Sequence, residues 1–445
     1  MVDTRIGQVR DLHQQLKSFT NDWAARKDVD MAAGDRLRGD ILRLNHQRYV
    51  DLIPIYRDLS ADLGAPAHPD LDFIAAELAS TDDIFKSYNP AYLETKDFHK
   101  MTQWLSTLHT RKIEVQANDV KTVSAWIARL AEDKVFSTFS SGTSGRLSFV
   151  PRDEYNWDNF LNNSAGYIAG LFAGLNMSYE NFDSVSLSFK GGNMGVGLVG
   201  QRLSRYAANS YFLYDAEISP DVLKVMRKEN PTPEEKKALD DYYDLILSHA
   251  EENFDRIIGR IFDSTREGKR KVKIFGAPFQ MKQLCERMIK TGRTLQVLPQ
   301  STLSFGGGWK TFEGEKIDRA ELLRMIREAL GVDDKYIFEG YSMTEMNVSL
   351  MRCPGDRYHI PPLLQAVVYD AALMPLAGKD VTGTFGYLDP FATSYPGFII
   401  TGDQIHLVDE TCSCGRVGPA IVGEVTRAPG REVKGCGGIM SAMKA

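Results

Sequence analysis

One segment of the chain combines hydroxyl-bearing side chains, glycines and a positive charge in a pattern suited to binding an anion. It comprises, in order, Ser140, Ser141, Gly142, Thr143, Ser144, Gly145 and Arg146. Small residues permit a tight turn whose backbone N–H groups face an anion closely, and the hydroxyls and the guanidinium add donors and charge. This chemistry suits a triphosphate, although the spacing is not that of a Walker loop. Taken alone, the segment fits a flexible Ser/Gly loop equally well.

Two later segments place acidic residues at the ends of apolar strands. The first supplies an aromatic ring, a hydroxyl and a carboxylate in Tyr341, Thr344 and Glu345, and the second ends in Thr-Gly-Asp at Asp403. An aromatic ring can stack on a base, one carboxylate can hold Mg²⁺, and another can accept hydrogen bonds from ribose hydroxyls. Either segment alone could be an ordinary strand end. Their order after the hydroxyl-rich loop predicts a nucleotide site.

In this order the segments resemble the adenylate-forming superfamily, which includes acyl-CoA synthetases, peptide-synthetase adenylation domains and firefly luciferase. The resemblance covers about residues 135–436. It implies that residues 140–145 hold the phosphates of ATP, that Tyr341 stacks on adenine and that Asp403 binds ribose. Thr344 and Glu345 would serve the phosphates and Mg²⁺. The family passes a glycine-rich strand between its adenine and acyl pockets, which here corresponds to Gly306, Gly307 and Gly308. Arg146 stands where many members have a lysine, so its role follows less directly.

Three of the five cysteines and one histidine fall into two pairs by their spacing. Cys353 and His359 follow the Glu345 segment, and Cys412 and Cys414 follow Asp403. Three thiols and an imidazole form a sound tetrahedral Zn²⁺ set, and four protein ligands leave no open position, which favours a structural site. Members similar to phenylacetate-CoA ligase carry a comparable Cys-x-Cys-Gly-Arg segment. The alternative is a group of buried cysteines without a metal.

The C-terminal residues suggest where an activated acyl group could go. Gly430-Arg431 matches the superfamily's hinge, after which a large mobile lid domain is usual, whereas here we expect only a short tail, residues 431–445. That tail resembles the end of the acyl-protein synthetases of bacterial bioluminescence (LuxE), in which a cysteine accepts the acyl group from acyl-adenylate and passes it to a reductase. Cys436 matches that acceptor. Lys434 and Arg431 could lower the pKa of its thiol; the alternative is a tail without a role.

A competing motif is the G-x-G-x-x-G pattern from Gly195 to Gly200, which lies between a predicted strand and a predicted helix and is followed by Asp215. Such a pattern is typical of dinucleotide binding and would indicate an NAD(P)-dependent oxidoreductase. Against it, residues 190–194 separate the strand from the glycines and are expected to spoil the tight strand-to-helix turn. The segment also lies within the region explained by the adenylation core. We therefore expect this loop to line the acyl pocket.

The elements that must position these residues change in character along the chain. Residues 1 to about 130 are predicted to be helical, with Ile6, Val9, Leu12 and Leu16 at helical spacing. From Val135 short apolar segments alternate with helical ones, the α/β pattern. The resemblance then implies the adenylate-forming large-domain fold, with mixed sheets flanked by helices, over residues 131–430, including a β-rich subdomain at about 340–430.

Composition excludes several other classes of protein. The 445 residues contain 53 Lys+Arg and 59 Asp+Glu, a net charge of -6, so no broad basic field is available to bind nucleic acid. No run approaches the roughly 18 apolar residues of a membrane span, and the N-terminus lacks the apolar run of a secretory signal. The odd number of cysteines, with Cys412 and Cys414 too close for an ordinary disulfide, favours a reduced, cytoplasmic compartment.

Together these features predict an enzyme that uses ATP and Mg²⁺ to convert a carboxylic acid to an acyl-adenylate. The acyl group would move to Cys436 and then to a partner protein, a reductase or a carrier. An acyl- or aryl-CoA ligase or an amide ligase on the same core is the nearest alternative. The oxidoreductase is an alternative of another class, and a catalytically silent scaffold is a third. The sequence leaves the identity of the acid open.

Overall fold

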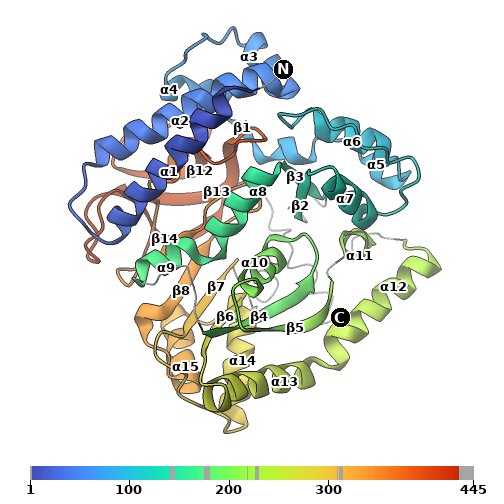
Figure 1. Cartoon of the computed structure of the whole chain (residues 1–445), viewed down its shortest axis with the longest axis vertical. Coiled ribbons are helices and arrows are strands. Elements are labelled where there is room, and N and C mark those ends of the chain that lie inside the picture. Colours follow the sequence, from blue (N-terminus) through green and yellow to red (C-terminus); the bar gives the residue numbers. More distant parts are fainter. Residues whose placement is uncertain are drawn as a thin grey trace. The chain divides into compact units, whose positions relative to one another are not determined.

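The computed structural model describes residues 3–140, 146–174, 181–217, 219–225, 230–307, 309 and 314–429. They form two compact units (Figure 1). Unit 1 contains residues 3–139, 148–174 and 343–429, and unit 2 contains residues 181–342 together with residues 140, 146 and 147. No helix among these residues has the length and apolar character needed to cross a membrane.

Unit 1 opens with helices, as the apolar spacing predicts. Asp30 caps the second helix by accepting a hydrogen bond from the backbone N–H of Ala32, and Thr122 caps a later one through Ala125. The helices are α1 (Arg5–Ala24), α2 (Met31–Leu52), α3 (Pro54–Asp62), α4 (Leu71–Phe73), α5 (Pro90–Glu94), α6 (Phe98–Ser106), α7 (Val123–Glu132), α8 (Glu154–Asn162) and α9 (Ile168–Phe172).

The strands of unit 1 lie mainly near its C-terminal end, where the sequence predicts that strands dominate. Six of them form antiparallel neighbours in the order β11-β12-β13-β14-β10-β9, and β1 (Ser80–Thr81) pairs in parallel with β13. Their bounds are β9 (Leu350–Arg352), β10 (Arg357–His359), β11 (Gln365–Tyr369), β12 (Asp380–Leu388), β13 (Phe398–Asp409) and β14 (Pro419–Arg427). Two shorter strands, β2 (Phe136–Ser140) and β3 (Ser148–Arg152), form a separate sheet.

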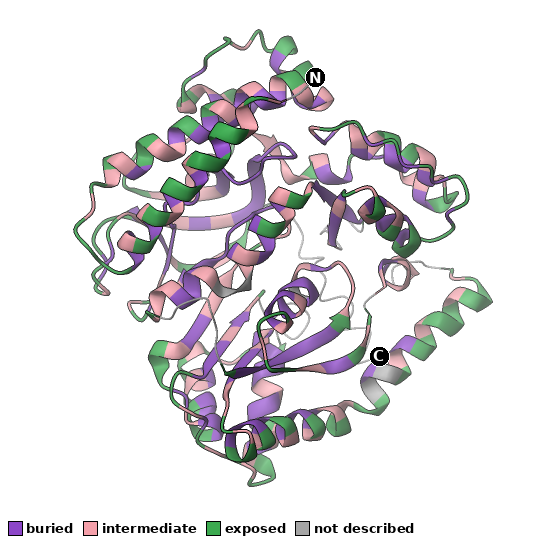
Figure 2. Ribbon diagram, viewed as in Figure 1, coloured by how far each residue is buried: buried purple, intermediate pink, exposed green. Residues whose placement is uncertain are grey.

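The N-terminal helices and the C-terminal strands of unit 1 share a hydrophobic core. Tyr49 and Ile53, at the end of α2 and just after it, pack in one buried cluster with Leu388 of β12 and Phe398 of β13. Figure 2 shows buried residues on the strands and exposed residues on the outer faces of the helices. Each large apolar side chain buried in this way contributes about 1.5–3 kcal/mol. This shared core explains why residues before 130 group with residues beyond 342 in one compact unit.

Unit 2 has the alternating α/β organisation that the sequence predicts. Its sheet is parallel, with strand order β8-β7-β6-β4-β5. The strands are β4 (Phe182–Gly191), β5 (Asn209–Glu217), β6 (Lys271–Gly276), β7 (Thr302–Gly306) and β8 (Ile337–Tyr341). The helices are α10 (Gly195–Ser204), α11 (Pro220–Val225), α12 (Pro233–Tyr243), α13 (Ala250–Phe262), α14 (Pro278–Lys290) and α15 (Arg319–Leu330).

The connection from β4 to α10 corrects one expectation. The strand continues through Lys190, with Gly191 paired to Glu217 of β5, so only residues 192–194 precede the helix. Gly192 has φ +99°, which permits this tight turn. The expectation that residues 190–194 spoil the turn is therefore wrong. A Cβ on Gly200 would lie 2.7 Å from Ser186 Oγ, so close packing of α10 on β4 accounts for at least one glycine of the motif.

Candidate nucleotide site and metal centre

The hydroxyl-rich loop is carried between β2 and β3. Residues 141–145 lie outside the described part of the chain, and Arg146 is exposed. Thr138 and Phe139 on β2 and Phe149 and Val150 on β3 are buried, so both strands are anchored in the interior where they approach the loop. The two strand ends that flank residues 141–145 are therefore held in place by buried side chains.

Glu345 lies beside one of these strand ends. Ser148, the first residue of β3, donates from Oγ to Glu345 Oε1 at 3.3 Å, and Thr344 Oγ1 donates to Glu345 Oε2 at 3.0 Å. Burial, and then the negative charge of Asp82, raise the pKa of the Glu345 carboxyl, while Thr344 and Arg152 oppose that shift. A buried carboxylate next to a hydroxyl offers the oxygen donors that Mg²⁺ prefers. The residues therefore fit the cation that the sequence resemblance implies.

The loop between β12 and β13 is hydrogen-bonded to the segment that contains Glu345. Tyr395 donates from its hydroxyl to the Glu345 carbonyl at 2.8 Å. Asp389 accepts from the backbone N–H of Asn347 at 2.8 Å and from its side-chain amide at 2.9 Å. Burial raises the pKa of Asp389 to about 6, against the hydrogen bonds that it accepts. Sequence reasoning missed these three residues, because Tyr395 and Asp389 are far from Glu345 in the chain and Asn347 looks like an ordinary polar residue beside it.

Asp403 is buried on β13 and directly faces a strand neighbour. It is paired in register with Arg427 of β14, whose Nη1 donates to Asp403 Oδ1 at 2.7 Å. A carboxylate in this position is suited to accept a hydrogen bond from a diol such as ribose. Arg427 was also missed from the sequence, because only the antiparallel pairing of β13 with β14 brings it opposite Asp403.

Three predicted residues lie in unit 2, at the carboxyl edge of its parallel sheet. Gly306 ends β7 opposite Gly340, and Tyr341 ends β8, half-buried. A Cβ on Gly306 would lie 2.4 Å from the Gly340 carbonyl oxygen, so only glycine permits this close approach of the two strands. Gly307 follows with φ +89°. Ligands of parallel α/β sheets bind at this edge. Gly308 lies outside the described residues.

Arg431, Lys434 and Cys436 also lie beyond the described part of the chain. The structure therefore describes neither the predicted hinge nor the predicted acyl acceptor.

The structure brings together the four predicted zinc ligands, all within unit 1. One ligand atom from each of Cys353, His359, Cys412 and Cys414 lies within 4.8 Å of the others. The Sγ atoms of Cys353 and Cys412 are 3.6 Å apart, and Cys414 Sγ lies 3.3 Å from His359 Nε2. Cys353 and Cys412 are buried and Cys414 is half-buried. Hydrogen bonds from Cys353 and His359 lower the pKa of the Cys414 thiol.

Two tight turns shape this cluster. The backbone N–H of Cys353 donates to the Arg357 carbonyl, and that of Cys412 donates to the Arg416 carbonyl, each at 2.9 Å. A Cβ on Gly355 would lie 2.8 Å from Cys412 Sγ, so glycine keeps the space between the turns open. Arg416 Nη1 donates to Cys414 Sγ at 3.6 Å, as suits a thiolate. Three sulfurs and one imidazole nitrogen are a donor set that fits tetrahedral Zn²⁺.

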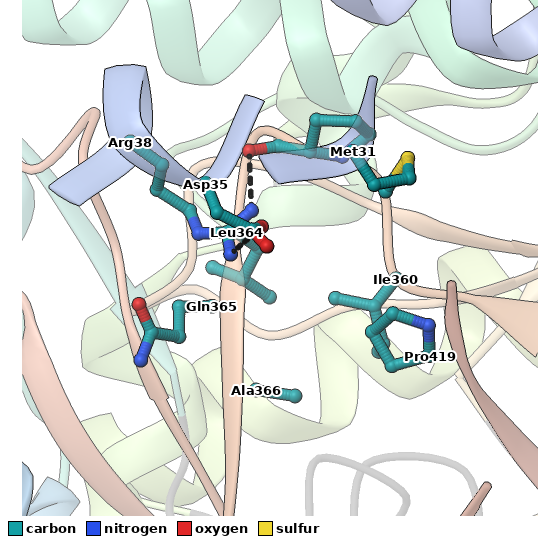
Figure 3. A pocket seen from close by; sticks show the side chains of 9 residues that line it. Met31, Asp35, Arg38, Ile360, Leu364, Gln365, Ala366 and Pro419 are labelled. Carbon is teal, nitrogen blue, oxygen red and sulfur yellow. Dashed lines mark hydrogen bonds and ion pairs between the residues drawn. The ribbon is translucent and has the colours of Figure 1, made fainter. Parts of the chain in front are cut away.

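A small cavity elsewhere in unit 1 contains none of the predicted site residues. Its volume is about 80 Å³, and its lining comes from α2, the β10–β11 connection, β11 and Pro419 (Figure 3). Arg38 donates to Asp35 Oδ1 at 2.6 Å and to the Pro362 carbonyl at 3.4 Å. The cavity is too small for a nucleotide.

Comparisons with known proteins agree with the sequence resemblance. The family model "Acyl-protein synthetase, LuxE" matches residues 252–444. The long-chain-fatty-acid–luciferin-component ligase of Vibrio harveyi is 24% identical over 364 residues, covering 80% of this chain and 85% of that protein. Its counterpart from Aliivibrio fischeri is 27% identical over 186 residues, covering 41% of this chain and 48%, about half, of that protein.

The structural comparison concerns the fold. A crystal structure of 2-hydroxyisobutyryl-CoA ligase, in complex with 2-HIB-AMP and CoA, has a TM-score of 0.51 at 15% identity and covers 90% of this chain and 76% of that one. The adenylate-forming enzyme fold predicted from the sequence is thereby confirmed. The resemblance to LuxE-type acyl-protein synthetases is also confirmed, and both named relatives are ligases.

Proposed function

We propose that this chain activates a carboxylic acid with ATP, forming an acyl-adenylate and pyrophosphate, and then transfers the acyl group to Cys436. The observation that carries the proposal is the hydrogen bond between Ser148 and Glu345. It joins the segment of Thr344 and Glu345 to the strand that follows the hydroxyl-rich loop, residues 140–146, which we call the phosphate loop. The similarity to acyl-protein synthetases supports it. The relatives' names point to a fatty acid as substrate and a protein as acyl acceptor.

In the first step a carboxylate oxygen attacks the α-phosphorus of ATP, and the bond to pyrophosphate breaks. Mg²⁺, when bound, would neutralise phosphate charge. Glu345 and Thr344 would hold that cation and orient the phosphates, while loop amides would donate hydrogen bonds and Arg146 would add positive charge. Asp403, oriented by Arg427, would accept hydrogen bonds from the ribose. Tyr341 would stack on adenine. The protein contributes by positioning and by electrostatic stabilisation, without a covalent intermediate in this step.

In the second step the Cys436 thiolate would attack the acyl carbonyl, with AMP as the leaving group and a thioester as the product. A thiolate is a strong nucleophile toward such a mixed anhydride. The thioester would then pass its acyl group to a partner protein, a reductase or a carrier. The stretch that matches the LuxE family model includes Cys436, which supports this assignment.

The first step is tested by acid-dependent exchange of labelled pyrophosphate into ATP, screened over aliphatic acids of increasing length and over aromatic acids. We expect exchange with at least one class, and long-chain aliphatic acids are tried first because of the relatives' names. Fluorescence energy transfer to bound NADH serves as the counter-test. Absence of exchange with every acid, together with NADH binding, would favour the oxidoreductase and contradict the proposal.

We further propose that the cluster of Cys353, His359, Cys412 and Cys414 holds a structural Zn²⁺. Cys353 follows β9 and His359 ends β10, whereas Cys412 and Cys414 lie between β13 and β14, so the metal would tie together the segments that follow Glu345 and Asp403 in unit 1. The same metal would also stabilise the packing of the N-terminal helices, because α1 is hydrogen-bonded to the segment that follows Cys414. Trp23 Nε1 donates to the Val417 carbonyl at 2.9 Å, and Arg416 Nη2 donates to the Ala24 carbonyl at 3.1 Å.

Replacing Cys412 by serine should reduce bound zinc from about one equivalent to nearly none, because a hydroxyl is a poor ligand for Zn²⁺. The melting temperature should fall as well, since the binding free energy of a structural metal is folding free energy. Metal analysis and thermal unfolding measure both effects. Cys285→Ser is the matched control, since Cys285 is buried on α14 of unit 2 and is not one of the four ligands. Equal zinc content in the wild type and Cys412→Ser would contradict the site.

A further inference from the structure

Arg152 is a completely buried arginine at the end of β3. Its exposed fraction is 0%. The guanidinium carbon lies 3.9 Å from the ring centre of Phe160 and 5.1 Å from that of Tyr395, so aromatic rings fix the plane of the group. Among the described residues, it forms no ion pair with a carboxylate. An arginine in such surroundings is costly to bury, and this raises the question of what its donors hold.

Its donors converge on the backbone and side chains around Glu345. Nη2 donates to the Thr344 carbonyl at 2.5 Å, Nε donates to Asn347 Oδ1 at 3.1 Å, and Nη1 donates to Thr138 Oγ1 at 2.9 Å. Thr138 lies on β2, on the other side of the phosphate loop. One guanidinium therefore connects both strands of the loop to Thr344, which immediately precedes Glu345, and to Asn347, two residues after it.

We propose that Arg152 is a positioning residue for the cation site: it sets the position of Glu345 relative to the two strands that carry the phosphate loop. This inference rests on the proposed function, and it extends that function to a residue that acts through the position of Glu345. Because the fork of a guanidinium supplies several donors in one plane, lysine cannot reproduce these three contacts. Tyr395 completes the arrangement, since its hydroxyl accepts from Arg152 Nη2 at 3.3 Å and donates to the Glu345 carbonyl.

The test is calorimetric titration of the full chain with ATP, once with Mg²⁺ and once with EDTA. In the wild type Mg²⁺ should tighten ATP binding. In Arg152→Lys we expect this Mg²⁺-dependent gain to fall about tenfold or more, while the affinity measured in EDTA changes little. Displacing a catalytic group by about 1 Å can cost about 100-fold in rate, so kcat/KM for MgATP in pyrophosphate exchange should fall by about that factor. The KM for the acid should stay unchanged.

Two variants keep the experiment decisive. Arg48→Lys is the control. Arg48 is also buried, at 2% exposed, and also donates a hydrogen bond, but it lies on α2 and its partner is Asp3. This variant should behave as the wild type. Tyr395→Phe should give a smaller loss with the same Mg²⁺ signature, and it decides the question if Arg152→Lys does not fold.

Equal losses of ATP affinity with and without Mg²⁺ would mean a purely structural role and overturn the inference, as would unchanged Mg²⁺ dependence in both variants. The inference would also be overturned if the wild type bound ATP with the same affinity in Mg²⁺ and in EDTA. A wild type that binds MgATP but exchanges pyrophosphate with no acid would instead contradict the proposed function, and the comparison of Mg²⁺ dependence would still decide the role of Arg152.

Discussion

Glu345→Gln is expected to lower acid-dependent pyrophosphate exchange by about 100-fold or more, the scale on which removal of one electrostatic contact to a transition state acts. The amide has the shape of the carboxylate: its oxygen can accept a hydrogen bond from one of the hydroxyls of Ser148 and Thr344, and its NH2 group can donate to the other. It lacks the negative charge that attracts Mg²⁺. The loss should therefore appear mainly as a higher Mg²⁺ requirement and a lower kcat.

Stability should respond differently from activity. A carboxylate as buried as that of Glu345 pays a desolvation penalty when it is charged, and that penalty is relieved in the amide. The melting temperature of Glu345→Gln should accordingly equal or exceed that of the wild type. Glu321→Gln, on the half-exposed start of α15, controls for loss of one negative charge elsewhere and should retain full exchange. Wild-type exchange in Glu345→Gln at low Mg²⁺ would contradict the role given to this carboxylate.

Much of the site was visible in the sequence because its residues occur in short, local patterns. Tyr341, Thr344 and Glu345 share one strand end, and the zinc ligands occur as two pairs separated by few residues. A local pair fixes the distance between two side chains almost independently of the rest of the fold. Only the meeting of the two pairs needed the tertiary structure, and antiparallel pairing of β10 with β14 supplies it.

The residues that were missed act over long separations. Arg152 and Asn347 are 195 positions apart, and each looks like an ordinary polar residue within its own segment. Their connection depends on how β3 packs against the Glu345 segment, which no periodicity encodes. The error at the end of β4 has the opposite origin. Gly191 and Gly192 look like a break in the sequence, but Gly191 pairs within the sheet and only Gly192 turns the chain.

The acyl acceptor is the remaining prediction with a large expected effect, and the structure narrows the choice of thiol. Burial raises the pKa of Cys285 to about 12, so this thiol is protonated and a poor nucleophile at neutral pH. Cys353, Cys412 and Cys414 face one another and His359 in the metal cluster, where coordination would occupy their sulfurs. Among the five cysteines of the sequence, Cys436 is the one that neither argument removes.

Cys436→Ser should therefore retain adenylate formation and lose acyl-protein formation almost completely. Pyrophosphate exchange should match the wild type, because the thiol takes no part in the first step. After incubation with ATP and a labelled acid, the wild type should carry label that hydroxylamine releases, as expected of a thioester, and the variant should carry nearly none.

Cys285→Ala is the control and should be labelled normally. Hydroxylamine-sensitive label on Cys436→Ser would place the acyl group on another residue, whereas exchange without label in both proteins, with acyl-CoA formed when CoA is added, would favour the CoA ligase. The two steps are chemically separable because attack at phosphorus and attack at the acyl carbon need different nucleophiles, so a single substitution can remove one and spare the other.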